Sequence, residues 1–158
     1  MININRVSRK WLERAIGEED NFDRFVYAWF AFNAIYSQFT DAREIDEIRQ
    51  AIRAQTHSVS PRTLYNFLNR DSVKFFGDRV IRNMKNPERV NLWNHQTLKN
   101  SNNSNEKRIM ALFGILYQIR CNLFHGNKLF DRDSDQEVIK NAQDVLINYL
   151  RLIKVETY

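Results

Sequence analysis

The chain has 158 residues, the usual size of one domain, and its 43% apolar and 13% aromatic residues are enough to bury a core. A single cysteine, Cys121, excludes an internal disulfide, and without a membrane-length apolar run or a signal-peptide core we expect a soluble cytoplasmic protein. The net charge of +5 suits a polyanionic partner such as nucleic acid, although many ordinary domains are equally basic.

Scarce glycine and proline, 4 and 2 residues, favour long helices over a turn-rich β fold. Ser8 is a candidate N-cap for a short first helix that ends at Gly17. Apolar residues at three- and four-residue spacing then predict a central helix over about 20–39. A charged segment with one isoleucine stripe predicts an outer helix over 43–55.

Two shorter helices are predicted in the middle of the chain. Ser60-Pro61 is a helix-start signal, because proline is favoured in the first turn. Asp71 starts a second helix, whose apolar positions continue through Met84. The segment 87–105 fits neither a helical nor a strand pattern clearly.

The C-terminal third predicts two long helices. The polar stretch Asn100–Asn105 reads as an exposed loop, and the widest apolar stripe in the chain follows it over 105–124. Gly126 is placed to end that helix, and Ser134 with Glu137 resembles a capping box that opens the last one. Long amphipathic helices joined by polar loops predict an all-α helical bundle with additional short helices.

The segment with the most informative chemistry runs from Arg120 to His125, Arg-Cys-Asn-Leu-Phe-His. Arginine can hold a phosphate with a fork of donors, and histidine moves a proton near neutral pH. On a continuous helix the two side chains would point about 140° apart, but a helix end at Gly126 would free His125. A second copy of the chain is the other way to complete such a site. Both residues also suit a helix C-terminus for electrostatic reasons alone.

Residues 119–126, Ile-Arg-Cys-Asn-Leu-Phe-His-Gly, resemble the Arg-(four residues)-His motif of HEPN domains, and the Leu-Phe-His-Gly ending resembles the Apea-like branch. The aromatic segment 29–36 is similar to the early helix of such proteins. The resemblance covers these two helices closely and the rest of the chain in general plan. It implies one HEPN-like domain over 1–158, an up-and-down helical bundle that forms a homodimer.

The resemblance also implies a metal-independent endoribonuclease without a cofactor. A ribose 2′-hydroxyl attacks the adjacent phosphate of RNA, which leaves a 2′,3′-cyclic phosphate and a 5′-hydroxyl. By this resemblance His125 is the acid–base group, Arg120 stabilises the transition state, and Asn122 assists. Many family members have the polar residue directly after the arginine, where this chain has Cys121. A toxin or anti-phage defence setting, with an antitoxin or regulatory protein as partner, follows from the resemblance alone.

Three further residues are predicted to contact substrate: Asn127, Lys128 and Asn33. Asn33 is unusual because a polar side chain on so apolar a helix needs a partner, either the motif or a neighbouring helix. Asn127 stands where toxins silenced by a nucleotidyltransferase often carry tyrosine, so the sequence does not support silencing by adenylation.

Several alternatives stay open beside the enzyme. The main one is a non-catalytic HEPN module that binds RNA, a nucleotide or a partner protein. Cys121 and His125 lie at i and i+4, but no third group identifies a nucleophilic pair. His57 and His95 are expected at the surface or in loops, with no zinc-ligand spacing around them.

Two charged patterns have simple structural interpretations. The acidic residues at 131–137 are spaced like the start of a calcium loop, but Gln136 replaces its required glycine, so we reject an EF-hand. Two basic runs are either solvated helix faces or phosphate contacts. These runs are Arg6, Arg9, Lys10 and Arg14, and Arg79, Arg82, Lys85 and Arg89.

Overall fold

The computed structural model describes residues 4–86, 88, 91–124, 133–153 and 155, and over this part the chain forms eight helices and no strand. The predicted all-α class is therefore confirmed. No helix in these ranges has both the length and the apolar character needed to cross a bilayer. The helices are α1 (Ile4–Gly17), α2 (Asn21–Tyr36), α3 (Glu44–Thr56), α4 (Pro61–Leu68), α5 (Asp71–Asp78), α6 (Leu92–Lys99), α7 (Asn105–Phe124) and α8 (Asp133–Leu152).

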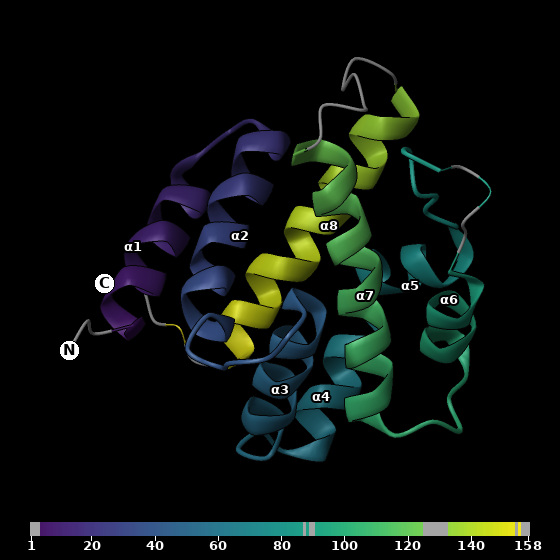
Figure 1. The fold of residues 1–158 in the computed structure, drawn as a ribbon, viewed down its shortest axis with the longest axis horizontal. Helices are drawn as coiled ribbons and strands as arrows, with labels where there is room; N and C mark the ends of the chain where they lie inside the picture. The colour runs from purple at the N-terminus through teal and green to yellow at the C-terminus, as the bar shows by residue number, and fades with distance from the viewer. Residues whose placement is uncertain (1–3, 87, 89–90, 125–132, 154, 156–158) are drawn as a thin grey trace.

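The long helices α2, α7 and α8 form the centre of the bundle (Figure 1). α1 packs along the outer side of α2, and α8 packs against both α2 and α5. α3, α4 and α6 pack against α7. α7 therefore has one side toward α2 and α3 and another toward α6, and this division decides where its side chains point.

Three buried rings join the central helices. Phe113 of α7 lies 4.8 Å from Phe32 of α2 and 4.6 Å from Tyr149 of α8, measured between ring centroids. Burying each ring contributes about 1.5–3 kcal/mol, so this cluster is a large part of the core. The Tyr149 hydroxyl donates to Gln55 Oε1 at 3.0 Å, which satisfies its polar atom, and burial raises the pKa of this phenol.

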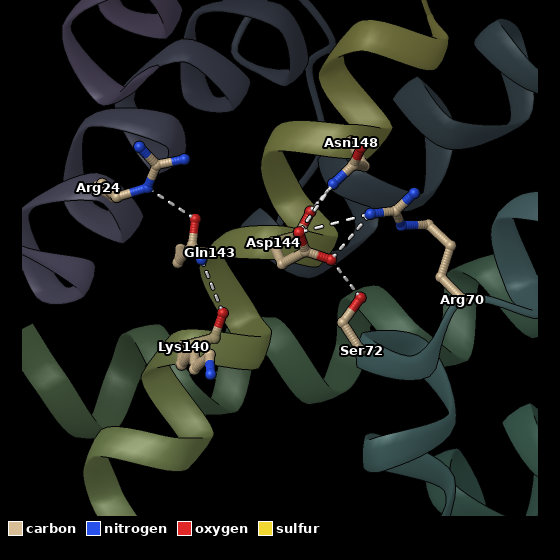
Figure 2. Close-up of polar contacts among 7 residues, drawn as sticks. All are labelled: Arg24, Arg70, Ser72, Lys140, Gln143, Asp144 and Asn148. Atoms are coloured by element: carbon tan, nitrogen blue, oxygen red, sulfur yellow. Dashed lines mark hydrogen bonds and ion pairs between the residues drawn. The ribbon is translucent and has the colours of Figure 1, made fainter. Parts of the chain in front are cut away.

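Two consecutive polar residues of α8 fix its position between its neighbours (Figure 2). Gln143 accepts a hydrogen bond from Arg24 Nε of α2 at 2.9 Å. Asp144 points to the other side, where it accepts from Ser72 Oγ of α5 at 2.6 Å and pairs with Arg70 at 3.3 Å. Rotation of α8 would break contacts on both sides at once.

The predicted helix starts near residues 20, 43, 60, 71 and 105 are confirmed, and the predicted caps Ser8 and Ser134 are wrong. Asp20 and Ser60 are N-caps, and their side chains accept from the backbone of the first turn. Ser8 instead lies inside α1, where its buried hydroxyl donates to the Ala31 carbonyl at 2.8 Å. Ser134 lies within α8, which already includes Asp133, so it does not cap the helix.

The helix predicted from Asp71 through Met84 is too long, because α5 ends at Asp78. Ile81 and Met84 donate their backbone N–H groups to side chains of α6 and α7 rather than to a continuing helix. The ambiguous segment 87–105 contains α6. The predicted cap Gly126 lies outside the described residues.

Candidate functional site

Ser104 directly precedes α7, and its hydroxyl accepts from the Lys107 N–H in the first turn. The motif residues lie in the last turns of this helix. Successive residues of an α-helix are rotated by 100°, so Arg120 and Asn122 project about 200° apart. The structure accordingly places them on opposite sides of α7. Arg120 contacts residues of α2 and α3, whereas Asn122 contacts the segment after α5.

Arg120 forms an ion pair with Glu44, the first residue of α3. Its Nη1 lies 3.3 Å from Glu44 Oε2, and the two side chains are 23% and 29% exposed. The other carboxylate oxygen of Glu44 accepts from the Tyr36 hydroxyl at 2.5 Å. Tyr36 of α2, Glu44 of α3 and Arg120 of α7 are therefore joined by consecutive polar contacts.

Aromatic rings surround the Arg120 guanidinium. Its Cζ lies 4.9 Å from the Phe124 centroid, 5.8 Å from Tyr117 and 6.0 Å from Trp29. Each such contact is worth about 0.5–2 kcal/mol, depending on how far the cation is desolvated. The rings restrict the position of the guanidinium on the side of α7 that faces α2.

Two buried donors in this cluster have no acceptor among the described residues, Arg120 Nε and Trp29 Nε1. Leaving a buried N–H unpaired costs about 1–3 kcal/mol, so such groups are rare and need an explanation. Both occur around one arginine, beside an ion pair that solvent can reach. The two unpaired donors distinguish this site from the other buried polar side chains of the described residues, which have hydrogen-bond partners.

The phenols of the cluster are protonated at neutral pH. Burial, reinforced by the hydrogen bond to Glu44, raises the pKa of Tyr36, and the bond from the exposed Asn33 side chain opposes this shift. Burial, followed by the neighbouring Cys121, raises the pKa of Tyr117 to about 12. Tyr36 and Tyr117 are thus hydrogen-bond donors and not bases. Asn33 therefore lies near the Tyr36 hydroxyl, and its predicted contact with substrate stays a prediction.

Asn122 has a different environment. It is 4% exposed, and its Oδ1 accepts from Met84 N at 3.1 Å and from Gln118 Nε2 at 2.9 Å. Its Nδ2 donates to the Arg82 carbonyl at 2.8 Å. The amide therefore holds the segment after α5 against α7. The structure does not bring it to Arg120, and its predicted part in the chemistry stays a prediction without a supporting contact.

The remaining predicted site residues, His125, Asn127 and Lys128, lie outside the described residues. Whether His125 meets Arg120 is therefore still a prediction. Cys121 is half-buried beside Tyr117.

The prediction that His95 is a surface or loop residue is wrong. His95 is buried in α6, with its Nδ1 2.7 Å from the Phe76 carbonyl and its Nε2 accepting from Ile81 N at 3.2 Å. Burial lowers the pKa of this imidazole, so it is neutral and joins α5 to α6. His57 is exposed directly after α3. In the described part of the chain no three His, Cys, Asp or Glu side chains gather as metal ligands would.

The two basic runs differ in the structure. Arg6, Lys10 and Arg14 are exposed on α1, and the Arg14 guanidinium lies 5.3 Å from the ring of Trp11. These positions agree with a solvated helix face, and phosphate contacts by this run stay a prediction. Three members of the second run, Arg79, Arg82 and Lys85, follow the end of α5 and do not lie on a helix, and Arg89 is outside the described residues.

Sequence reasoning missed Glu44, Tyr36 and Tyr117. Glu44 reads as one of several acidic residues in a first helical turn, which is an ordinary feature of helices. It is 76 residues from Arg120, so no local spacing connects them. Tyr36 and Tyr117 fall within apolar periods and read as core.

No protein-family model, curated protein or solved structure is significantly similar to this chain. The HEPN resemblance of 119–126 therefore stays a resemblance. Function has to be inferred from this motif and from the side chains around Arg120.

Proposed function

We propose that this protein is a metal-independent endoribonuclease of HEPN type, with Arg120 and His125 as its catalytic residues. The observation that carries the proposal is the state of Arg120. This motif arginine is partly exposed near the end of a 20-residue helix, is restricted by three rings, and has a buried Nε–H without an acceptor in the described chain. A pre-positioned guanidinium with donors to spare suits a phosphorane-like transition state.

In the proposed reaction the 2′-oxygen of RNA bonds to the adjacent phosphorus and the bond to the 5′-oxygen breaks. One proton leaves the 2′-hydroxyl and one reaches the departing 5′-oxygen. His125 is the side chain assigned to this proton transfer, since imidazole titrates near neutral pH. Tyr36 and Tyr117 are not bases, because their pKa values are raised. In a homodimer the second motif would line the same cleft.

The Arg120–Glu44 pair favours a second candidate, a non-catalytic module that binds RNA, a nucleotide or a partner protein. A carboxylate 3.3 Å from Nη1 neutralises the guanidinium within one chain. For the enzyme, an RNA phosphate must compete with Glu44 for the same donors. The pair is 23% and 29% exposed, so solvent and an incoming phosphate can reach the same donors, which makes such an exchange feasible.

The direct test is incubation with RNA in excess chelator, followed by analysis of the new ends. We expect 2′,3′-cyclic phosphate and 5′-hydroxyl ends. His125→Ala should lower the rate at least ~100-fold, the usual scale for losing a general acid–base, and Arg120→Ala by about 10²–10³.

Matched controls are His57→Ala and Arg62→Ala, which remove exposed residues of the same types elsewhere on the surface. Both should retain the wild-type rate. A rate that His125→Ala leaves unchanged would reject the enzyme. RNA binding without cleavage, weakened by Arg120→Ala, would select the module instead.

The homodimer is tested by solution mass at micromolar concentration. We expect twice the mass of the chain, because the proposed cleft takes one motif from each copy. A monomer at every concentration that still cleaves RNA would exclude a composite site.

A further inference from the structure

A second candidate site lies at the opposite end of α7. A cavity of about 300 Å³ is bounded by the end of α4, by α5 and α6, and by the start of α7. In Figure 1 α4 lies to the left of the lower half of α7, and α6 lies to its right. Arg108 lines this cavity, twelve residues before Arg120, which corresponds to about 18 Å along the helix axis. The cavity is therefore separate from the candidate ribonuclease site.

The cavity combines an apolar wall with a cationic rim. The buried side chains of Leu68, Val73 and Leu98 form the wall. Volumes near 300 Å³ are at the lower end for small-molecule sites, which bury an apolar part of the ligand and fix it with a few polar groups. The size suits a compact organic molecule.

The charges that line the cavity do not balance. Lys74, Lys99 and Arg108 are cationic and Asp78 is the one carboxylate among its lining residues, which leaves a net charge of +2. Asp78 pairs with Lys99 at 2.9 Å, but the two side chains are 74% and 68% exposed. Exposed pairs of this kind contribute little, so Lys99 can exchange this partner for a ligand.

Arg108 is the fixed part of the rim. Its Nε–H donates to the Leu98 carbonyl at 2.8 Å, which holds the guanidinium against α6. No carboxylate of the described residues pairs with it, and burial lowers its pKa. A partly desolvated cation without a counter-ion is unfavourable, and an anion bound beside it would remove that penalty.

We propose that this cavity binds a small phosphomonoester with a compact apolar body. The phosphate would take the terminal nitrogens of Arg108 and the ammonium of Lys74, and the apolar body would pack on Leu68, Val73 and Leu98. A net charge of +2 matches the charge of a phosphomonoester dianion, and the guanidinium fork matches its oxygens. This inference does not depend on the proposed ribonuclease activity.

The test is titration of the ¹⁵N-labelled protein with phenyl phosphate, followed by amide shifts. Two parallel titrations test the two parts of the proposed ligand separately. Inorganic phosphate tests the charged part, and benzyl alcohol tests the apolar part. We expect phenyl phosphate to shift amides of α5, α6 and the start of α7, with a Kd on the order of 0.1–1 mM. Each half-probe should bind at least ~10-fold more weakly, because it fills only part of the cavity.

Arg108→Gln should weaken phenyl phosphate binding at least ~10-fold, whereas Arg62→Gln, on the exposed surface of α4, should not. Because Arg108 also bonds to Leu98, Lys74→Gln is the second variant, at an exposed position, with an expected ~3-fold loss. Arg120→Ala should leave this binding unchanged even if it abolishes RNA cleavage.

Three results would overturn the proposal. The first is the absence of shifts at this cavity in the wild-type protein. The second is binding that neither Arg108→Gln nor Lys74→Gln weakens. The third is weaker binding of an RNA oligonucleotide to both variants with unchanged phenyl phosphate binding, which would make the cationic rim a contact for the RNA backbone.

Discussion

The two long sides of α7 share one helix but have opposite characters. The side toward α2 and α3 carries rings and a cation, and the side toward α6 carries a glycine and two amides. The first set is Phe113, Tyr117, Arg120 and Phe124. The second set is Gly114, Gln118 and Asn122.

The difference lies in how the polar groups are satisfied. Arg120 keeps a buried N–H without an acceptor in the described chain and is partly open to solvent. Asn122, two residues later, uses its amide oxygen twice and its amide nitrogen once within the protein. A contiguous motif can therefore combine one residue available for chemistry with another that holds the fold. Four predictions examine this division.

The largest expected effect is the loss of Asn122. Asn122→Ala would leave the Met84 N–H and the Arg82 carbonyl without their partner, and we expect the free energy of unfolding to fall by about 2–4 kcal/mol. Urea unfolding measures this change. Asn66→Ala, on the exposed side of α4, is the matched control and should stay within about 0.5 kcal/mol. Equal stability of both variants would remove the structural role assigned to Asn122.

The next effect concerns the closeness of α6 to α7. A Cβ at Gly114 would lie 2.5 Å from Asn94 Nδ2, whereas a Cβ at Gly77 would meet nothing closer than 3.9 Å. We expect Gly114→Ala to destabilise the protein by about 1–2 kcal/mol, although alanine is the better helix former, because the buried amide must move. Gly77→Ala should be neutral or stabilising.

A second substitution distinguishes crowding from other causes. Truncation of the neighbour in Gly114→Ala/Asn94→Ala should restore part of the stability lost in Gly114→Ala, measured as a coupling energy in a double-mutant cycle. Strictly additive effects would show that the added methyl group at position 114 does not crowd the Asn94 side chain.

These features show what the sequence could and could not predict. The apolar periods of α2 and α7 and the Ser60-Pro61 start of α4 are local signals, so the sequence alone predicts them. Serine is a favoured N-cap residue, but Ser8 lies inside α1. Its hydroxyl donates to the Ala31 carbonyl, 23 residues away in the sequence. Local pattern alone does not contain that contact.

The same distinction applies to the end of α5 and to the site. Ile81 and Met84 continue a helical period, yet bonds to His95 and Asn122 end the helix at Asp78. Arg120 was found because its motif is contiguous. Its partner Glu44 was not, because their pairing arises only when α3 packs on α7.

The third prediction uses pH to test the α6 side. Burial lowers the pKa of His95, so the unfolded chain takes up its proton first as pH falls below about 6.5. This contribution to stability is present above that pH and is lost on acidification, with a slope of at most about 1.4 kcal/mol per pH unit for one proton. His95→Gln should lower stability at pH 7.5 and flatten its dependence between pH 7.5 and 5.5. A variant with the wild-type slope would show that His95 does not titrate in this range.

The smallest effect tests the other side of α7. Glu44→Gln removes the carboxylate next to Arg120, and if this guanidinium contacts RNA phosphates, affinity should rise about 3- to 10-fold at low salt. Stability should change by less than about 1 kcal/mol, because the pair is partly exposed. Fluorescence anisotropy with a labelled oligonucleotide measures the affinity.

The control for Glu44→Gln is Asp46→Asn, which removes an equal charge from the same turn of α3. Asp46 pairs with Arg43 and Arg49 and has no contact with Arg120. A gain confined to Glu44→Gln would mean that Glu44 competes with RNA for Arg120. An equal gain in both variants would reflect net charge alone and would contradict the proposal that the aromatic side of α7 binds RNA.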